Sequence, residues 1–276
     1  MSTTIPTSAA NPAAGASKNT RLDRHRVGAV VRKELTEFRR SRFIVVTMAV
    51  LPLVFLISPT ASILASKATV GSTKLDVTVG YSLMFLLLIP VFIPATVAAY
   101  SVVGERDQGT LEPVLTTPIR REELLIGKAI ANFIPAVVLA YLVDGLFLTI
   151  VAIGAKPVIA SAVFHSPQLI ATAFYVPLLA GWAIWMGLAV STKASDTRVA
   201  QQLSTLASLP PLVLIALMSF QVIKPTLTIA LALAGVLLVI DCGGYLLVSR
   251  LFDRERLVTG TKLSSGPARK RRFGWP

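Results

Sequence analysis

The sequence has few charged residues and almost no cysteine or histidine. Only 15% of its 276 residues are charged, and because soluble domains carry roughly 25%, the composition argues against a soluble globular domain. The single cysteine, Cys242, lies inside an apolar run, which excludes a disulfide framework and a thiolate metal cluster. Redox and thiolate-metal chemistry are therefore excluded.

Acidic residues are also scarce, with 14 Asp and Glu against 27 Lys and Arg, which gives a formal net charge of +13. A basic excess can indicate nucleic-acid binding. However, a nucleic-acid binder spreads its basic residues over one folded face and does not also carry several apolar runs of about 20 residues. Here 54% of the residues are hydrophobic, and a lipid bilayer accounts for both the apolar and the basic stretches.

The hydrophobic residues gather in runs that are long enough to cross a bilayer, since a hydrocarbon core of about 30 Å takes about 20 helical residues. Six runs reach this length: 43–65, 79–103, 129–153, 168–192, 202–222 and 226–249. Five of them contain proline, namely Pro52, Pro59, Pro90, Pro94, Pro135, Pro177, Pro210 and Pro211. Neighbouring helices, hydroxyl groups or waters can satisfy the carbonyls that proline frees. The sequence therefore predicts an all-α membrane protein with six transmembrane helices, several of them kinked.

The distribution of basic residues predicts how these spans are oriented. If the runs alternate in direction, 23 Lys and Arg lie on one side of the membrane and 4 on the other. Cytoplasmic loops carry the excess of Lys and Arg, so both termini are predicted to be cytoplasmic in a multi-pass protein of the plasma (inner) membrane. The loops on the other side are short, which leaves no room there for a folded domain.

The two ends of the chain are predicted to be tails around a permease domain at 24–253. Residues 1–23 are rich in Ala, Ser, Thr and Pro without periodicity, which is typical of disorder. Residues 254–276 form a basic cytoplasmic tail that includes Arg269 to Arg272. That cluster either attracts anionic lipid or is a solvated tail whose charge only sets the orientation.

Residues 24–42 are predicted to form an amphipathic helix before the first span. At 100° per residue its apolar residues share one face: Val27, Val30, Val31, Leu35 and Phe38. Arg32, Lys33, Arg39 and Arg40 fall opposite. Glu34 lies within the apolar stripe, which is costly against lipid but favourable against a protein surface that offers a cation. The helix is therefore either an interfacial anchor or an element that docks a partner protein.

The loop 104–128, GERDQGTLEPVLTTPIRREELLIGK, is the one long cytoplasmic connection. Gly109 is predicted to end the second span, and Thr110 to cap a short helix with Leu111 on its apolar face. Thr117 and Pro118 are typical of the start of a second helix, which then runs into the third span, with Glu122 and Glu123 near its positive end. The short helix is either a lever for a partner protein or part of an ordinary structured loop.

These residues carry a family resemblance. The loop 104–128, together with Lys33-Glu34-Leu35 in the preceding helix, resembles the membrane subunit of the type-2 ATP-binding-cassette transporter family over about 24–253, with Val114 where leucine is usual. The resemblance implies that this loop supplies a coupling helix for an ATPase subunit, which the amino-terminal helix also contacts. By that similarity the ATPase-coupling residues are Glu34, Glu105, Arg106, Gly109, Thr110, Leu111, Glu112 and Pro118.

The chain lacks the residues needed to hydrolyse ATP itself. A phosphate-binding loop needs G-x-x-x-x-G-K-[ST], whereas Gly127-Lys128 is followed by Ala129 and has no glycine at the earlier position. We therefore expect a transport subunit rather than an enzyme, with no cofactor or metal on this chain. The resemblance implies that ATP and Mg bind to a separate cytosolic ATPase subunit, and that a second permease subunit completes a homo- or heterodimer.

Polar and aromatic residues within the spans are candidates for a substrate path. Asp144 and Asp241 are the acidic residues inside the runs, and their expected depths differ by roughly 9–10 Å, so they are poor candidates for one paired site. Tyr175, Trp182 and Met186 share a helical face. Each of these groups either contacts substrate or only packs against neighbouring helices.

The residues and the resemblance together predict the membrane subunit of an ATP-driven exporter of a small hydrophobic or amphipathic molecule, such as a drug. One alternative is an exporter of a lipid, polymer or haem-related substrate. An alternative of another class is a membrane anchor or sensor that recruits a cytosolic partner without moving anything.

Overall fold

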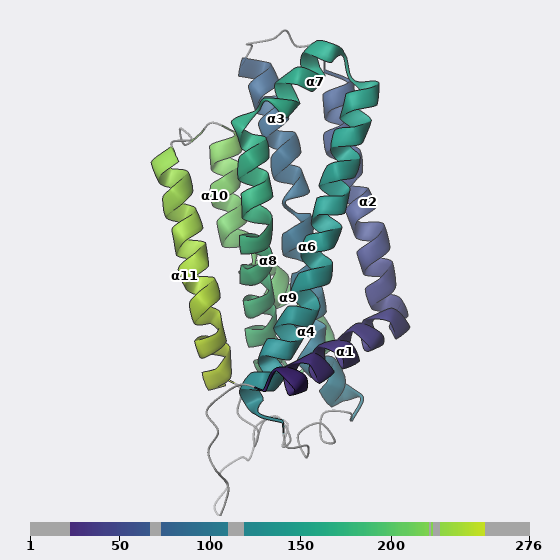
Figure 1. Cartoon of the computed structure of the whole chain (residues 1–276), viewed down its shortest axis with the longest axis vertical. Coiled ribbons are helices and arrows are strands. Elements are labelled where there is room, and N and C mark those ends of the chain that lie inside the picture. The colour runs from purple at the N-terminus through teal and green to yellow at the C-terminus, as the bar shows by residue number, and fades with distance from the viewer. Residues whose placement is uncertain (1–22, 67–72, 110–118, 221, 223–226, 252–276) are drawn as a thin grey trace, which may run out of the picture.

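The computed structural model describes residues 23–66, 73–109, 119–220, 222 and 227–251. These residues form an elongated bundle of helices, and they include no strand (Figure 1). The helices are α1 (Arg24–Arg40), α2 (Arg42–Leu64), α3 (Thr73–Leu86), α4 (Ile89–Asp107), α6 (Arg121–Gly154), α7 (Pro157–Phe164), α8 (Pro167–Lys193), α9 (Thr197–Ala207), α10 (Leu209–Ser219) and α11 (Leu227–Leu251). The predicted all-α fold class is confirmed.

The apolar runs of the sequence all become helices of the bundle. Five helical stretches are long and apolar enough to cross a membrane: Ile44–Leu64, Lys74–Asp107, Glu122–Gly154, Pro167–Lys193 and Thr197–Met218. The sixth run corresponds to α11, whose apolar part Thr228–Gly244 is shorter. The chain is thus an all-α multi-pass membrane protein.

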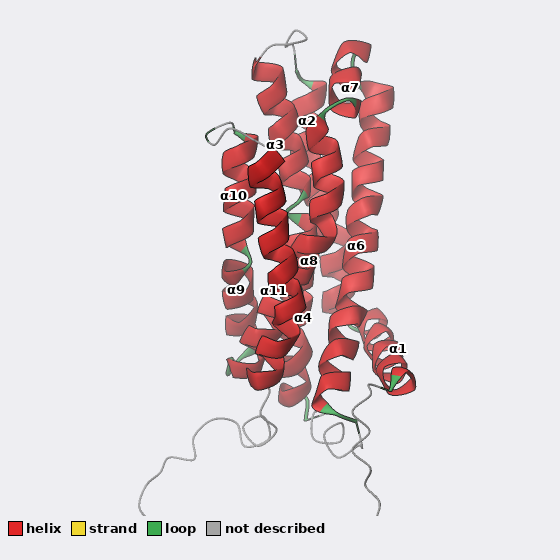
Figure 2. Cartoon of the chain, turned by 60° about the vertical axis from the view of Figure 1, so that its left-hand side comes forward, coloured by secondary structure: helices red, strands yellow, loops and turns green. Residues whose placement is uncertain are grey.

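Two of the expected proline kinks are complete breaks between helices. The chain leaves the helix at Leu87-Leu88, just before Pro90 in the first turn of α4, and at Ser208, just before Pro210 and Pro211 in α10. Proline tolerates the first turn of a helix because its missing N–H would have no partner there. Figure 2 shows that α9 and α10 still follow one another along the bundle. The other prolines of the spans lie inside continuous helices.

Helix α4 is the central element, and its residues are buried on nearly every side. Its contact with α8 depends on small residues. An added Cβ at Gly187 would lie 2.7 Å from Cβ of Ala98. The Oγ atom of Ser191 donates to the carbonyl of Ala99 at 2.6 Å and accepts from the backbone N–H groups of Val102 and Val103. Such contacts hold helices together in lipid, where burial of apolar surface adds little.

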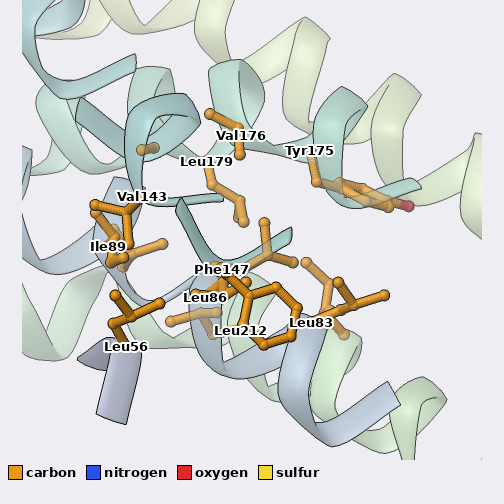
Figure 3. Packing of buried hydrophobic residues seen from close by; sticks show 14 of the residues in the cluster. Leu56, Leu83, Leu86, Ile89, Val143, Phe147, Tyr175, Val176, Leu179 and Leu212 are labelled. Atoms are coloured by element: carbon orange, nitrogen blue, oxygen red, sulfur yellow. The ribbon is translucent and has the colours of Figure 1, made fainter. Parts of the chain in front are cut away.

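The largest cluster of buried apolar residues that the described part of the chain forms lies between the helices. It joins α2, α3, α6, α8 and α10 through residues such as Leu56, Leu83, Phe147, Leu179 and Leu212 (Figure 3). Large apolar side chains also cover the outside, among them Ile57, Leu142 and Val239, which are 66%, 64% and 69% exposed. An apolar outer surface is expected where helices contact lipid.

The amphipathic segment forms α1, which lies obliquely across the end of the bundle where α4 ends and α6 begins (Figure 1). We call this the α1 end. Asp23 caps α1 by accepting from the backbone N–H of His25, and the helix stops at Ser41, slightly earlier than the predicted 42. Ser41 also caps α2. This junction turns the chain from the end of the bundle into the first span.

Candidate functional site

Two of the predicted coupling residues meet at the α1 end, where a lysine joins them. Glu34 of α1 and Glu105 of α4 both contact Lys128 of α6. The Nζ atom of Lys128 lies 2.7 Å from Oε1 of Glu34 and 2.9 Å from Oε2 of Glu105, and it also donates to the carbonyl of Ser101 at 3.0 Å. This ion cluster therefore connects three helices that lie far apart in the sequence.

Burial makes the cluster strong. The three side chains are 2%, 7% and 0% exposed for Glu34, Glu105 and Lys128 respectively. A buried charge is costly unless it is paired and hydrogen-bonded, so each ion depends on the others. Loss of one partner would leave a remaining buried charge with fewer compensating contacts.

Lys33 extends the cluster towards the surface. Its amine donates to Glu105 and lies 3.1 Å from Oε1 of Glu37. Burial alone would lower the pKa of Lys33, but Glu105, Glu34 and Glu37 raise it above the ordinary lysine value. The stabilising contribution of a raised lysine pKa is complete below about pH 10.4 and is lost only as the pH rises through the folded-state value. Lys33 therefore stays charged throughout the neutral range.

The carboxylates near Lys33 and Lys128 are already paired with amines. Oxygens of Glu34, Glu37 and Glu105 lie within 4.8 Å of one another, a spacing that could hold a metal ion. However, the ammonium groups of Lys33 and Lys128 contact all three carboxylates. The arrangement supports a structural link between helices rather than metal chemistry.

The structure identifies the cation that pairs with Glu34 in the apolar stripe of α1. The sequence left open that a partner protein supplies the cation for Glu34, whereas Lys128 of the same chain supplies it. Glu34 therefore attaches α1 to its own bundle, and by itself it is no argument for a partner. Lys33 is predicted on the polar face of α1. Its amine instead contacts Glu105 of the cluster.

Sequence reasoning missed Lys128 as a member of the site, although Gly127-Lys128 belongs to the motif of the loop. Nothing in the local pattern indicates which glutamate the lysine meets. The preceding glycine also has a role, because an added Cβ at Gly127 would lie 2.5 Å from a methyl group of Val30. The Gly-Lys pair thus brings α1 close and then binds it.

A second contact fastens the start of α1 to the start of α6. Glu123 is 1% exposed and accepts from the backbone N–H groups of Asp23 and Arg120, at 3.1 and 3.0 Å. The predicted start of this helix at Thr117-Pro118 is wrong, since α6 begins at Arg121. The physical reason is that Glu123 at the third helical position bonds the backbone N–H of Arg120 and so caps the helix there.

The other predicted coupling residues lie at the edges of the loop or beyond the described residues. Arg106 donates to the carbonyl of Ala194, between α8 and α9, at 2.7 Å. Gly109 has a φ of 68°, a left-handed conformation that glycine adopts readily, and it ends α4 as predicted. Thr110, Leu111, Glu112 and Pro118, and with them the predicted coupling helix, lie outside the described residues, as do the tails 1–22 and 254–276.

The predicted substrate-path residues do not gather in one cavity. The hydroxyl of Tyr175 donates to the carbonyl of Ala230 on α11, and the indole N–H of Trp182 donates to the carbonyl of Ala207 on α9. Met186 and Asp144 are half-buried. Their roles in transport stay predictions.

Asp241 lines a separate apolar cavity of about 320 Å³ between α6, α8 and α11, together with Phe133, Gly181 and Trp185. Its neighbours on α6 end at Phe133, which precedes Asp144 by about 16 Å of helix. Asp144 does not line this cavity.

A family model described as "ABC-2 family transporter protein" matches residues 28–240. The matched range contains the ion cluster, the loop 104–128 and most of the bundle. No curated protein matches the chain.

Proposed function

This chain belongs to the ABC-2 family of transporter proteins and is a transmembrane subunit of an ABC transporter, and we propose that it exports a small hydrophobic or amphipathic molecule, such as a drug. We further propose that ATP and Mg bind to a separate ATPase subunit on the cytoplasmic side, and that two permease subunits form the pathway. The absence of a phosphate-binding loop from the sequence supports the first of these proposals.

The observation that carries the proposal is the ion cluster of Glu34, Glu105 and Lys128 beside the segment 110–118. The helices on either side of that segment in the sequence are both held by buried contacts. The α4 side is held by Glu105 and Arg106, and the α6 side by Glu123 and Lys128. A force applied to the segment by an ATPase would therefore act on α1, α4 and α6 together.

In the proposed mechanism, closure of the ATPase subunits displaces the coupling segment, and the three connected helices move as one unit against the rest of the bundle. The breaks between α3 and α4 and between α9 and α10 supply places where a span can bend. Alternation of the bundle between two arrangements would open the pathway first to one side and then to the other.

The experiment that tests coupling uses the chain purified with its ATPase subunit and reconstituted in vesicles. Glu105→Gln and Glu34→Gln are expected to leave a folded complex whose ATPase activity responds less to transported substrate. Glu37→Gln, on the exposed rim of the same helix, is the matched control and is expected to keep the wild-type response. Equal responses in all three variants would contradict a coupling role for the cluster.

Transport itself is measured as ATP-dependent accumulation of labelled hydrophobic compounds in inverted vesicles. Asp144→Asn is expected to change which compounds accumulate if Asp144 lines the path. Asp241→Asn makes the same substitution at the different membrane depth predicted for Asp241. Accumulation of no compound, together with intact binding of the ATPase subunit, would favour an anchor or sensor instead. Export is contradicted if substrate leaves rather than enters inverted vesicles.

A further inference from the structure

The basic residues of α1 fall into two groups with different surroundings. Arg26 and Lys33 face the bundle and pair with carboxylates of Glu123, Glu105 and their neighbours. By contrast Arg24, Arg32 and Arg39 are exposed, and within the described part of the chain they form no ion pair. Arg40 is likewise exposed and has no ion pair among the described residues. Four cations of α1 therefore lack a carboxylate partner there, and three of them, Arg24, Arg32 and Arg39, line one groove.

The three arginines lie on one face of α1 and mark a strip about 22 Å long. They fall within about 80° of one another at 100° per residue, and 15 residues of helix separate the first from the last. Val31 and Leu35, at the neighbouring edge of the apolar stripe, line the same groove and are only half-buried. The strip is therefore both cationic and apolar.

The strip forms one wall of an open groove of about 1670 Å³ between α1, α2 and α6. The opposite walls are apolar and come from the first two turns of α2 and from α6 as far as its fourth turn. They consist of Val45, Met48, Ala49, Ile126, Ile130 and Pro135. Val45 is 46% exposed and Ile130 is 36% exposed, and both belong to the membrane-spanning stretches. The groove thus begins at the arginines and continues along surface that faces hydrocarbon.

We propose that this groove binds an anionic phospholipid of the leaflet on the α1 side. Its phosphate would pair with Arg24, Arg32 or Arg39, and its acyl chains would cover the apolar walls of α2 and α6. Guanidinium groups suit phosphate because they donate several hydrogen bonds in a fixed geometry. A bound lipid would also bridge α1 to α2 and α6 along the open side of the groove.

The depth of the groove favours lipid over a protein partner. An acidic surface of an ATPase subunit could neutralise the arginines, but it could not fill walls that lie within membrane-spanning stretches. Only a molecule with a charged head and long apolar chains satisfies both parts of the groove at once. The proposal concerns lipid bound to the permease and does not depend on which molecule is exported.

The test measures lipid binding to the full-length chain, delipidated in detergent, by native mass spectrometry. The probes are phosphatidylglycerol and phosphatidylcholine with identical acyl chains. Since one basic residue near an anionic surface adds roughly fivefold in affinity, phosphatidylglycerol is expected to bind the wild type at least about tenfold more tightly. Combined Arg24→Gln, Arg32→Gln and Arg39→Gln substitutions should reduce this preference to about onefold.

Two further variants separate the groove from charge in general. Combined Arg40→Gln, Lys193→Gln and Arg198→Gln substitutions remove the same charge from exposed positions outside the groove, and they are expected to keep the preference. Ala49→Trp fills the apolar wall and should weaken both lipids while the arginines remain.

The proposal would be overturned if both lipids bound the wild type with equal affinity. It would also be overturned if both triple variants lost the preference for phosphatidylglycerol to the same extent. So would a groove variant that keeps its lipid preference but no longer retains the ATPase subunit, because the groove would then be a protein contact.

Discussion

At the scale of single residues, the chain buries full charges at the α1 end, where burial is costly unless the charges are paired. Glu34, Glu105 and Lys128 are almost completely buried near the ends of membrane spans. They are tolerated because they compensate one another within 3 Å. The energetic cost of separating them holds α1, α4 and α6 together at this end of the bundle.

Substitution of Lys128 by methionine should destabilise the protein strongly. It leaves two buried carboxylates without their main partner, which costs about 3–5 kcal/mol for a broken buried pair. The expected result is a clear fall in the midpoint of thermal unfolding in detergent. Glu37→Gln, which removes a half-exposed partner of Lys33, should change the midpoint little. A fall no larger for Lys128→Met than for Glu37→Gln would contradict the importance of the buried pairs.

A double-mutant cycle measures the pair of Glu34 and Lys128 more directly. Because the two side chains are in contact, Glu34→Gln combined with Lys128→Met is expected to cost less free energy of unfolding than the sum of the single substitutions. An additive result would mean that the contact contributes nothing. Denaturant unfolding of the single and double variants, measured side by side, supplies the comparison.

At the scale of helices, the contact between α4 and α8 depends on the absence of a side chain at Gly187. Gly187→Ala would place Cβ 2.7 Å from Cβ of Ala98 and 3.0 Å from the carbonyl oxygen of Ala95. The helices must then separate, so we expect a loss of about 1–3 kcal/mol in unfolding free energy. Gly145→Ala, which meets nothing within 4 Å on α6, should be neutral or slightly stabilising. Similar effects at both positions would rule out close packing as the cause.

The attachment of α1 can be tested through two adjacent glutamates of α6. Glu123 is buried and bonds the backbone of Asp23, whereas Glu122 is exposed. Glu123→Gln should therefore weaken the hold on the first turn of α1 and increase amide hydrogen exchange there, because bonds to a charged acceptor contribute about 1.5–3 kcal/mol each. Glu122→Gln should leave exchange in α1 unchanged, and faster exchange in both variants would assign the effect to charge alone.

At the scale of the whole molecule, the orientation in the membrane is predicted from charge and can be measured with thiols. In a Cys242→Ala background, Lys193→Cys at the α1 end should react with a membrane-impermeant reagent only after the cells are permeabilised. Lys156→Cys, between α6 and α7, should react in intact cells. The reverse pattern would show that the 23-to-4 division of basic residues does not set the orientation as expected.

The length and periodicity of the sequence were enough to predict much of the fold. The six apolar runs, the helix before the first span and the end of α4 at Gly109 all follow from local properties, namely apolar length, helical period and the backbone freedom of glycine. The positions of helix ends depend also on side-chain contacts that the local pattern does not specify. The start of α6 depends on the side chain of Glu123 reaching back to Arg120, and its buried bond to Asp23 comes from a distant element.

The sequence by itself determined that the chain is helical and membrane-spanning, because apolar length is a property of contiguous residues. The loop motif together with Lys33-Glu34-Leu35 of the first helix also predicted roles for Glu105 and Glu34. Only the tertiary structure decided what those glutamates do, since their partner Lys128 lies 94 positions from Glu34 and no local pattern connects them. It likewise decided that Arg24, Arg32 and Arg39 face an open groove while Arg26 and Lys33 are paired. Partners across the bundle are chosen by packing, which no single stretch of sequence contains.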